Sequence, residues 1–220
     1  MHEIISLPYG YFDACCYLIK LPSSTCLIDP AVSPDMLPAG LPPVRWIIAT
    51  HGHFDHISHA DSLRRATNAP ILIHQAEAMY LTQAQLNLSV TMQRSAKLQP
   101  ADQLLKDQQL INLTDGYQLL AMHTPGHTPG GICLVLTQDD QPLAMFSGDT
   151  LFAGSIGRLD LGGSLNDMVR TLNRLKSYSQ QLSQDIIVYP GHGPATSLIE
   201  EIRCNPYFRM NPAQIDEADF

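Results

Sequence analysis

The feature that most constrains this fold is a set of short apolar runs that each end in histidine or aspartate. RWIIAT (45–50) precedes HGHFDH, YQLLAM (117–122) precedes HTPGHTPGG, LAMFSG (143–148) precedes DTLFAGSIGR, and IIVYP (186–190) precedes GHGPAT. Runs of this length and composition predict β-strands. If the C-terminal ends of these strands share one edge of the fold, their polar residues converge on rigid supports.

The remaining chain predicts more strands with helices between them. Further strand-like runs lie at 17–21, 25–29, 70–74 and 131–137, and helices are expected over roughly 55–67, 76–88, 164–179 and 196–204. Ser164 is the expected N-cap of the third helix, with Asp167 in its first turn. This order predicts two sheets packed face to face with helices outside, in one domain spanning 1–220.

Composition narrows the function. Lys and Arg number 13 against 21 Asp and Glu, a net charge of −8, which argues against long nucleic acids as substrates. The N-terminus lacks the pattern of a signal peptide, and no apolar run reaches the length of a membrane span. Five cysteines without a CxxC pair predict neither a disulfide framework nor a thiolate zinc site, so we expect a cytoplasmic protein.

The window ATHGHFDHISHAD (49–61) has the composition of a metal site. His51 and His53 are two apart, so an extended segment points both side chains the same way. Asp55 and His56 follow as the chain turns into a helix, toward a second position. The strand ends together offer seven ligand-type groups: His51, His53, Asp55, His56, His127, Asp149 and His192. Seven are too many for one ion and suit two, with Asp149 as the natural bridge because a carboxylate has two oxygens.

Other conspicuous residues are interpreted as structural. His2, His59, His74 and His123 are isolated histidines, of which His74 is expected to cap a turn and His123 to support the site without binding metal. Cys15 and Cys16 are expected to pack near a strand start and Cys133 in the core. Arg158 is the isolated cation beside the site, and a surface salt bridge and an anion-binding role are both open for it.

Four segments carry a family resemblance. THGHFDH (50–56), TPGHTPGG (124–131), SGDTLFAGSIGR (147–158) and YPGHGPAT (189–196) resemble, in order, the motifs of the metallo-β-lactamase fold. The resemblance implies an α/β fold, a four-layer αββα sandwich, with a dinuclear site. It further implies that His51, His53 and His127 hold one metal, that Asp55, His56 and His192 hold the other, and that Asp149 bridges them.

Within that superfamily the GDTLFAGSIGR block is most similar to the glyoxalase II group, the hydroxyacylglutathione hydrolases, and especially to its short single-domain bacterial branch. This resemblance implies a thioesterase that cleaves S-lactoylglutathione or a related hydroxyacyl thioester through a metal-bound hydroxide, with Asp55 orienting the nucleophile and Arg158 near a cationic glutathione-binding position. Two departures stand out: 28 residues follow His192, where the full-length enzymes add a helical domain, and Pro194 stands where they tend to place a tyrosine. True β-lactamases of this fold do not usually carry the bridging aspartate.

Rival interpretations share the same core. A persulfide dioxygenase of this superfamily would hold one iron through the equivalents of His51, His127 and Asp149, and the Asn205–Pro206 pair occurs in similar form there. Lactonase or phosphodiesterase activity on the same metal core is also compatible with the motifs, as is a non-enzymatic binding role. We expect two divalent metal ions, zinc first, with iron or manganese also suited to these ligands. The expected partner is a small molecule, and the expected assembly is a monomer or homodimer.

Overall fold

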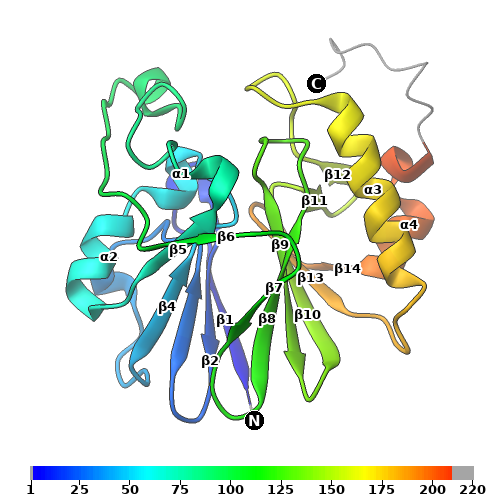
Figure 1. Cartoon of the computed structure of the whole chain (residues 1–220), viewed down its shortest axis with the longest axis horizontal. Coiled ribbons are helices and arrows are strands. Elements are labelled where there is room, and N and C mark those ends of the chain that lie inside the picture. Colours follow the sequence, from blue (N-terminus) through cyan, green and yellow to red (C-terminus); the bar gives the residue numbers. More distant parts are fainter. Residues whose placement is uncertain (1, 210–220) are drawn as a thin grey trace.

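The computed structural model describes residues 2–209, and two six-stranded sheets dominate it (Figure 1). The first sheet has the order β1-β2-β3-β4-β5-β6: β1 Glu3–Leu7, β2 Cys16–Lys20, β3 Thr25–Ile28, β4 Val44–Ile48, β5 Ile71–His74 and β6 Gln103–Leu105. The second has the order β14-β13-β10-β9-β8-β7: β7 Gln109–Asn112, β8 Tyr117–His123, β9 Ile132–Gln138, β10 Gln141–Gly148, β13 Ile187–Pro190 and β14 Thr196–Ser197. A small hairpin of β11 Leu151–Phe152 and β12 Ser155–Ile156 follows β10.

Helices cover the outer faces of both sheets. α1 Phe54–Ile57 and α2 Ala60–Thr67 lie beside the first sheet, and α3 Leu165–Ser179 and α4 Leu198–Cys204 lie beside the second (Figure 1). The layers therefore run helix, sheet, sheet, helix, and the expected four-layer αββα sandwich is confirmed. Among residues 2–209, no helix combines the length and apolarity that a membrane crossing requires.

Apolar side chains fill all three interfaces between the layers. One cluster, which includes Ile19, Ile48 and Phe146, lies between the sheets, while two others lie beneath the helices. Both faces of the central strands are therefore buried, which explains why they read as unbroken apolar runs instead of alternating ones. Burial of each large side chain contributes about 1.5–3 kcal/mol, so the sheets form a rigid base for the loops at their ends.

α3 begins and packs as its sequence predicts. The Ser164 side chain accepts a hydrogen bond from the Asp167 backbone N–H, which confirms the predicted N-cap. Met168, Leu172 and Leu175 are buried at spacings of four and three, so one stripe of the helix faces the second sheet.

The predicted helix over 76–88 is wrong. A short 3₁₀ turn, Gln75–Glu77, is followed by turns and a second 3₁₀ segment, Ser89–Met92. The Asn87 side-chain amide donates to the Tyr80 carbonyl at 2.9 Å and to the Ala96 carbonyl at 3.2 Å. A side chain that bonds to backbone carbonyls in this way competes with helical hydrogen bonds, which explains the irregular conformation.

Two other predicted helices are shorter than expected. The 55–67 helix divides into α1 and α2 because His59 has non-helical backbone angles and its N–H donates to the Pro30 carbonyl. The 196–204 helix begins only at Leu198, since Thr196 and Ser197 pair with β13 as an edge strand. The eight predicted strands are present, while β1, β6, β7, β11, β12 and β14 were not predicted.

Candidate metal centre

All seven predicted ligand-type residues meet at one rim of the sandwich. Three groups have ligand atoms within 4.8 Å of one another: His51, His53 and His127; His51, His56 and Asp149; Asp55, His56 and His192. His51 and His53 follow β4, Asp55 and His56 belong to α1, and the other three residues follow β8, β10 and β13. The strand-end pattern therefore predicted the convergence correctly.

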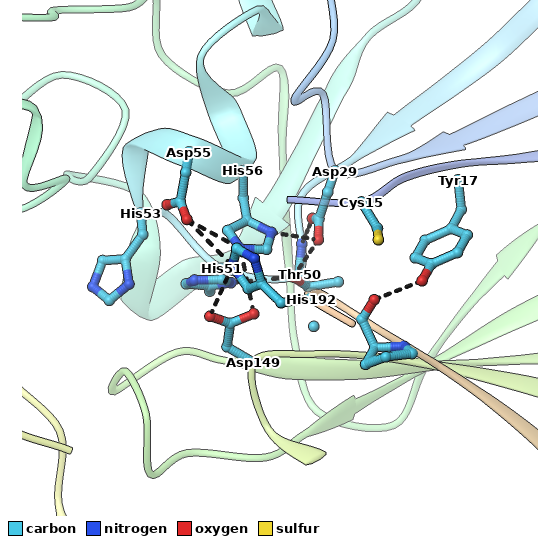
Figure 2. A network of polar contacts seen from close by, with 12 residues as sticks. Cys15, Tyr17, Asp29, Thr50, His51, His53, Asp55, His56, Asp149 and His192 are labelled. Carbon is cyan, nitrogen blue, oxygen red and sulfur yellow. Dashed lines mark hydrogen bonds and ion pairs between the residues drawn. The ribbon is translucent and has the colours of Figure 1, made fainter. Parts of the chain in front are cut away.

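Asp149 faces histidines from both halves of the molecule. Its Oδ1 lies 3.3 Å from His56 Nε2, and its Oδ2 lies 3.5 Å from His127 Nε2 and 3.6 Å from His192 Nε2. Asp55 and Asp149 approach the His56–His192 pair from opposite sides (Figure 2). Asp149 therefore lies between the His51–His53–His127 group and the Asp55–His56–His192 group, which is the position that a bridging carboxylate requires.

In three of these histidines Nδ1, the ring nitrogen that faces away from the centre, lies next to an oxygen that can only accept a hydrogen bond. The pairs are His56 Nδ1 with Asp29 Oδ2 at 3.0 Å, His127 Nδ1 with the Arg158 carbonyl at 2.6 Å, and His192 Nδ1 with the Phe12 carbonyl at 3.0 Å. Each Nδ1 must therefore carry the hydrogen. In the neutral ring this leaves the Nε2 lone pair facing the centre, which is the orientation that metal-binding histidines need.

The buried polar atoms at the centre fit divalent cations. His51 Nε2 and Asp149 Oδ1 are buried without a hydrogen-bond partner, although Asp149 Oδ1 lies near His56. His53 Nδ1 and His127 Nε2 are 2.9 Å apart, so these two ring nitrogens are close enough to bind the same ion. Unsatisfied buried polar atoms are costly, and a bound cation would satisfy these. Imidazole and carboxylate donors suit several divalent metals.

The electrostatic environment divides the histidines into two kinds. Burial holds the pKa of His51 well below its ordinary value, and burial together with the His127 ring lowers the pKa of His53 to about 3. Burial also opposes the charged forms of His56 and His192, but the nearby Asp55 and Asp149 carboxylates outweigh it and raise both pKa values. One side of the centre thus offers neutral rings, and the other pairs its rings with acids.

Asp29 supports the centre and was missed by the sequence analysis. It is buried, it accepts hydrogen bonds from the Thr50 backbone N–H at 2.6 Å and the Thr50 hydroxyl at 2.8 Å, and it holds His56. Thr50 Oγ1 in turn lies 3.2 Å from His51 Nδ1. Asp29 follows directly after β3, so the strand-end rule that found the other residues could have found it as well.

Glu77 is the second missed residue. Its side chain is fully buried, its Oε2 accepts from the Gly52 N–H at 3.0 Å, and its Oε1 accepts from the Gly130 N–H at 2.7 Å. Gly52 separates His51 from His53, and Gly130 lies in the loop of His127. One carboxylate thereby joins the two loops that carry the His51, His53 and His127 side chains.

Arg158 lies beside the centre, but its charge already has a partner. Arg158 Nε and Nη2 each donate to the Asp160 carboxylate at 2.6 Å, and the Arg158 side chain is 57% exposed. The β11–β12 hairpin, which precedes Arg158, is held by hydrogen bonds to Glu201 in α4 and to Asn205 directly after that helix. Glu201 accepts from the Gly154 N–H at 2.9 Å, and Asn205 Nδ2 donates to the Ser155 carbonyl at 3.0 Å.

The residues interpreted as structural lie outside the ligand groups. His74 caps the Gln75–Glu77 turn as predicted, and His123 stacks on it with ring centroids 4.2 Å apart. His123 Nε2 is 2.9 Å from the carbonyl of Pro129, within the His127 loop. All five cysteines lie within residues 2–209 as free thiols, and Cys15, Cys16 and Cys133 are buried as expected.

An αββα sandwich with this donor set at its rim defines a protein built to hold divalent metal ions. The chain belongs to the metallo-beta-lactamase superfamily, whose family model matches residues 10–192. It is 31% identical to the probable metallo-hydrolase YqgX of Bacillus subtilis, covering 91% of this chain and 95% of that one. It is 30% identical to the probable metallo-hydrolase MJ0888 of Methanocaldococcus jannaschii, covering 84% of this chain and 89% of that one.

Solved structures agree with this family. The B3 metallo-beta-lactamase BLEG-1 superposes with a TM-score of 0.84 at 29% identity, over 94% of this chain and 100% of that one. TTHA1623, solved in a di-iron-bound form, superposes with a TM-score of 0.75 at 31% identity, over 93% of this chain and 99% of that one. The expected fold family is therefore confirmed.

Proposed function

We propose that this protein is a dinuclear metal-dependent hydrolase of thioesters, of the glyoxalase II type, acting on S-lactoylglutathione or a related hydroxyacyl thioester. The observation that carries the proposal is the Asp149 carboxylate, whose Oδ1 lies near His56 and whose Oδ2 lies near both His127 and His192. Relatives named probable metallo-hydrolases and the di-iron-bound form of TTHA1623 support it.

The proposed ligand sets follow the groups described above. His51, His53 and His127 would hold one ion, Asp55, His56 and His192 the other, and Asp149 both. Bound divalent ions lower the pKa of water and polarise a carbonyl, which is the chemistry that thioester hydrolysis needs. Zinc is the first candidate, and iron and manganese also suit these donors.

Asp55 is proposed to have a second role. Burial opposes its ionisation, but His56 and His192 outweigh it and lower the pKa of Asp55, so the carboxylate is charged at neutral pH. Its Oδ2 lies 3.3 Å from His192 Nε2, and the residue also lines the adjacent cavity. A carboxylate in this position can accept a hydrogen bond from the attacking water and orient it toward the substrate.

Arg158 is proposed to attract an anionic group on the thiol portion of the substrate. It lines the same cavity as Asp55, and its exposed guanidinium can add a carboxylate partner beside Asp160. A thiolate leaves readily, so we assign no residue as a dedicated acid for the leaving group.

The test combines metal analysis with a substrate panel. We expect two divalent ions per chain and turnover of glutathione thioesters in preference to lactones, phosphodiesters and β-lactams. One iron per chain with oxygen uptake on glutathione persulfide would instead establish a dioxygenase and overturn this proposal.

Asp149→Ala tests the bridging role. We expect kcat/KM to fall by more than about 100-fold, since even residues that only support ligands are worth 10–100-fold. The ion stoichiometry should fall as well, because Asp149 is proposed to hold both ions. Asp35→Ala is the matched control, as Asp35 is an exposed aspartate that does not line the cavity. Two tightly bound ions in Asp149→Ala would contradict the bridge.

A further inference from the structure

A cavity of ≈ 560 Å³ adjoins the proposed metal centre. His53, Asp55, His127, Asp149 and His192 form one part of its lining, so a group bound in the cavity lies next to the reacting bond. The volume is within the range of small-molecule sites. The chemistry of the remaining walls therefore bears on which substrate this hydrolase selects.

Most of the remaining wall is apolar. The apolar lining residues are Phe54 from α1, Leu88 and Met92 from the segment between β5 and β6, and Phe152, Ile156 and Leu161 from the β11–β12 hairpin and the segment after it. Phe12 adds an aromatic ring that is 72% exposed. Its backbone has a φ of 56°, a conformation that bulky residues rarely adopt, and its carbonyl accepts from His192. The Phe12 backbone is thus held beside the metal centre, and its exposed side chain lines the cavity, where a substrate can cover it.

The polar side chains of these walls already have partners within the chain. Asn87 donates to the Tyr80 and Ala96 carbonyls, Thr91 donates to the Leu88 carbonyl at 2.7 Å, and Ser155 donates to the Ile156 carbonyl at 3.4 Å. A polar substrate group placed against them would lose hydrogen bonds to water and gain few in return. An apolar group meets no such cost.

We infer that the cavity receives the acyl portion of the thioester, and that it selects an uncharged apolar acyl chain over the small hydroxylated lactoyl group. This inference rests on the proposed thioesterase function and specifies its substrate class. The lactoyl group leaves most of the apolar wall in contact with water, whereas a chain of several methylenes covers it. Arg158, which lines the same cavity, is assigned to the leaving thiol as proposed above.

The increase in kcat/KM for each added methylene of the acyl chain can be predicted. Removing one methylene from water is worth about 0.8 kcal/mol, which corresponds to about a fourfold increase in kcat/KM. Metal-loaded protein should be assayed with S-lactoyl-, S-acetyl-, S-butyryl- and S-hexanoylglutathione, which share the thiol and differ in the acyl group. We expect kcat/KM to rise by up to about fourfold per methylene across the unsubstituted series, and S-hexanoylglutathione to exceed S-lactoylglutathione.

The outcomes separate this inference from the function on which it rests. A flat or falling series, or S-lactoylglutathione as the best substrate, would overturn the acyl selectivity and leave the thioesterase function standing. Absence of turnover with every thioester would overturn the proposed function and the inference with it.

A matched pair of substitutions localises the effect. Met92→Gln replaces an apolar side chain of the wall with an amide of similar length, and it should flatten the chain-length dependence. Met79→Gln makes the same change at an exposed methionine that does not line the cavity, and the dependence should persist. Equal slopes in the two variants would place the acyl chain elsewhere.

Discussion

Glu77→Gln should weaken one ion position of the centre and spare the other. The Glu77 carboxylate accepts from the Gly52 N–H at 3.0 Å and from the Gly130 N–H at 2.7 Å, so it uses both oxygens as acceptors. Glutamine has the same shape but one acceptor, and its NH₂ group would face one of the two N–H groups. One buried donor is thereby left unsatisfied.

The magnitude follows from that lost acceptor. An unsatisfied buried donor costs about 1–3 kcal/mol. The two N–H groups belong to the loops of His51, His53 and His127, so the cost appears mainly when those three residues must hold an ion. We expect affinity at that position to fall about 10–100-fold, the range for lost supporting hydrogen bonds at metal sites.

The other position has independent supports. His56 is held by Asp29 and His192 by the Phe12 carbonyl, and neither contact involves Glu77. Titration of the loaded protein with a competing chelator should therefore show one weakened ion and one whose affinity changes by less than about twofold, well below the 10–100-fold effect of a lost support. Glu200→Gln, at an exposed glutamate, is the control.

The stability of the metal-free protein shows whether Glu77→Gln acts by misplacing the metal-binding loops or by destabilising the whole fold. Burial raises the pKa of Glu77, so its ionisation opposes folding, and this cost grows as pH rises through the window just above the ordinary glutamate value. Glutamine does not ionise. The unfolding free energy of the metal-free variant, relative to wild type, should therefore increase across that window. Equal weakening of both ions, or unchanged affinity at both, would refute the reasoning.

Two further predictions concern pH and the thiol portion of the substrate. Acidification should release the ion on the His56–His192 side first, because the raised pKa values of these histidines favour protons that compete with the metal. The His53 pKa of about 3 protects the ion on the other side. The metal content after dialysis at stepped pH measures the order of release, and simultaneous loss of both ions would contradict this prediction. Arg158→Ala should raise KM for glutathione thioesters by about twofold to fivefold, as expected for an exposed ion pair, and Asp160→Asn should lower it; steady-state kinetics that show no opposite trend would remove the anchoring role.

The convergence of the seven candidate ligands was predictable because each strand and the polar residues after it are adjacent in sequence. Asp149 follows β10 directly, and His51 follows β4 after two residues, so recognising the strand also places the side chain. Apolar runs of four to eight residues identify such strands well. Asp29 obeys the same rule after β3, yet a single carboxylate without a neighbouring histidine has no local pattern that suggests a site.

Glu77 escaped prediction for a different reason. The 76–88 segment was expected to form a helix, in which a glutamate is an ordinary solvent-facing residue. Its actual conformation depends on the Asn87 side chain, which bonds to the backbone of Tyr80 and Ala96. Competition of this kind between side chain and backbone depends on contacts at a distance of seven to nine residues, which helical periodicity does not include.

The orientation of the candidate ligands is harder to predict from the sequence than their convergence. His127 and His192 are oriented by the carbonyls of Arg158 and Phe12, and every residue type offers a carbonyl. What places these acceptors is backbone conformation, including the left-handed Phe12 at a φ of 56°. Residue types therefore specify which atoms can bind metal, whereas the loops that return to the rim specify which nitrogen of each ring faces it.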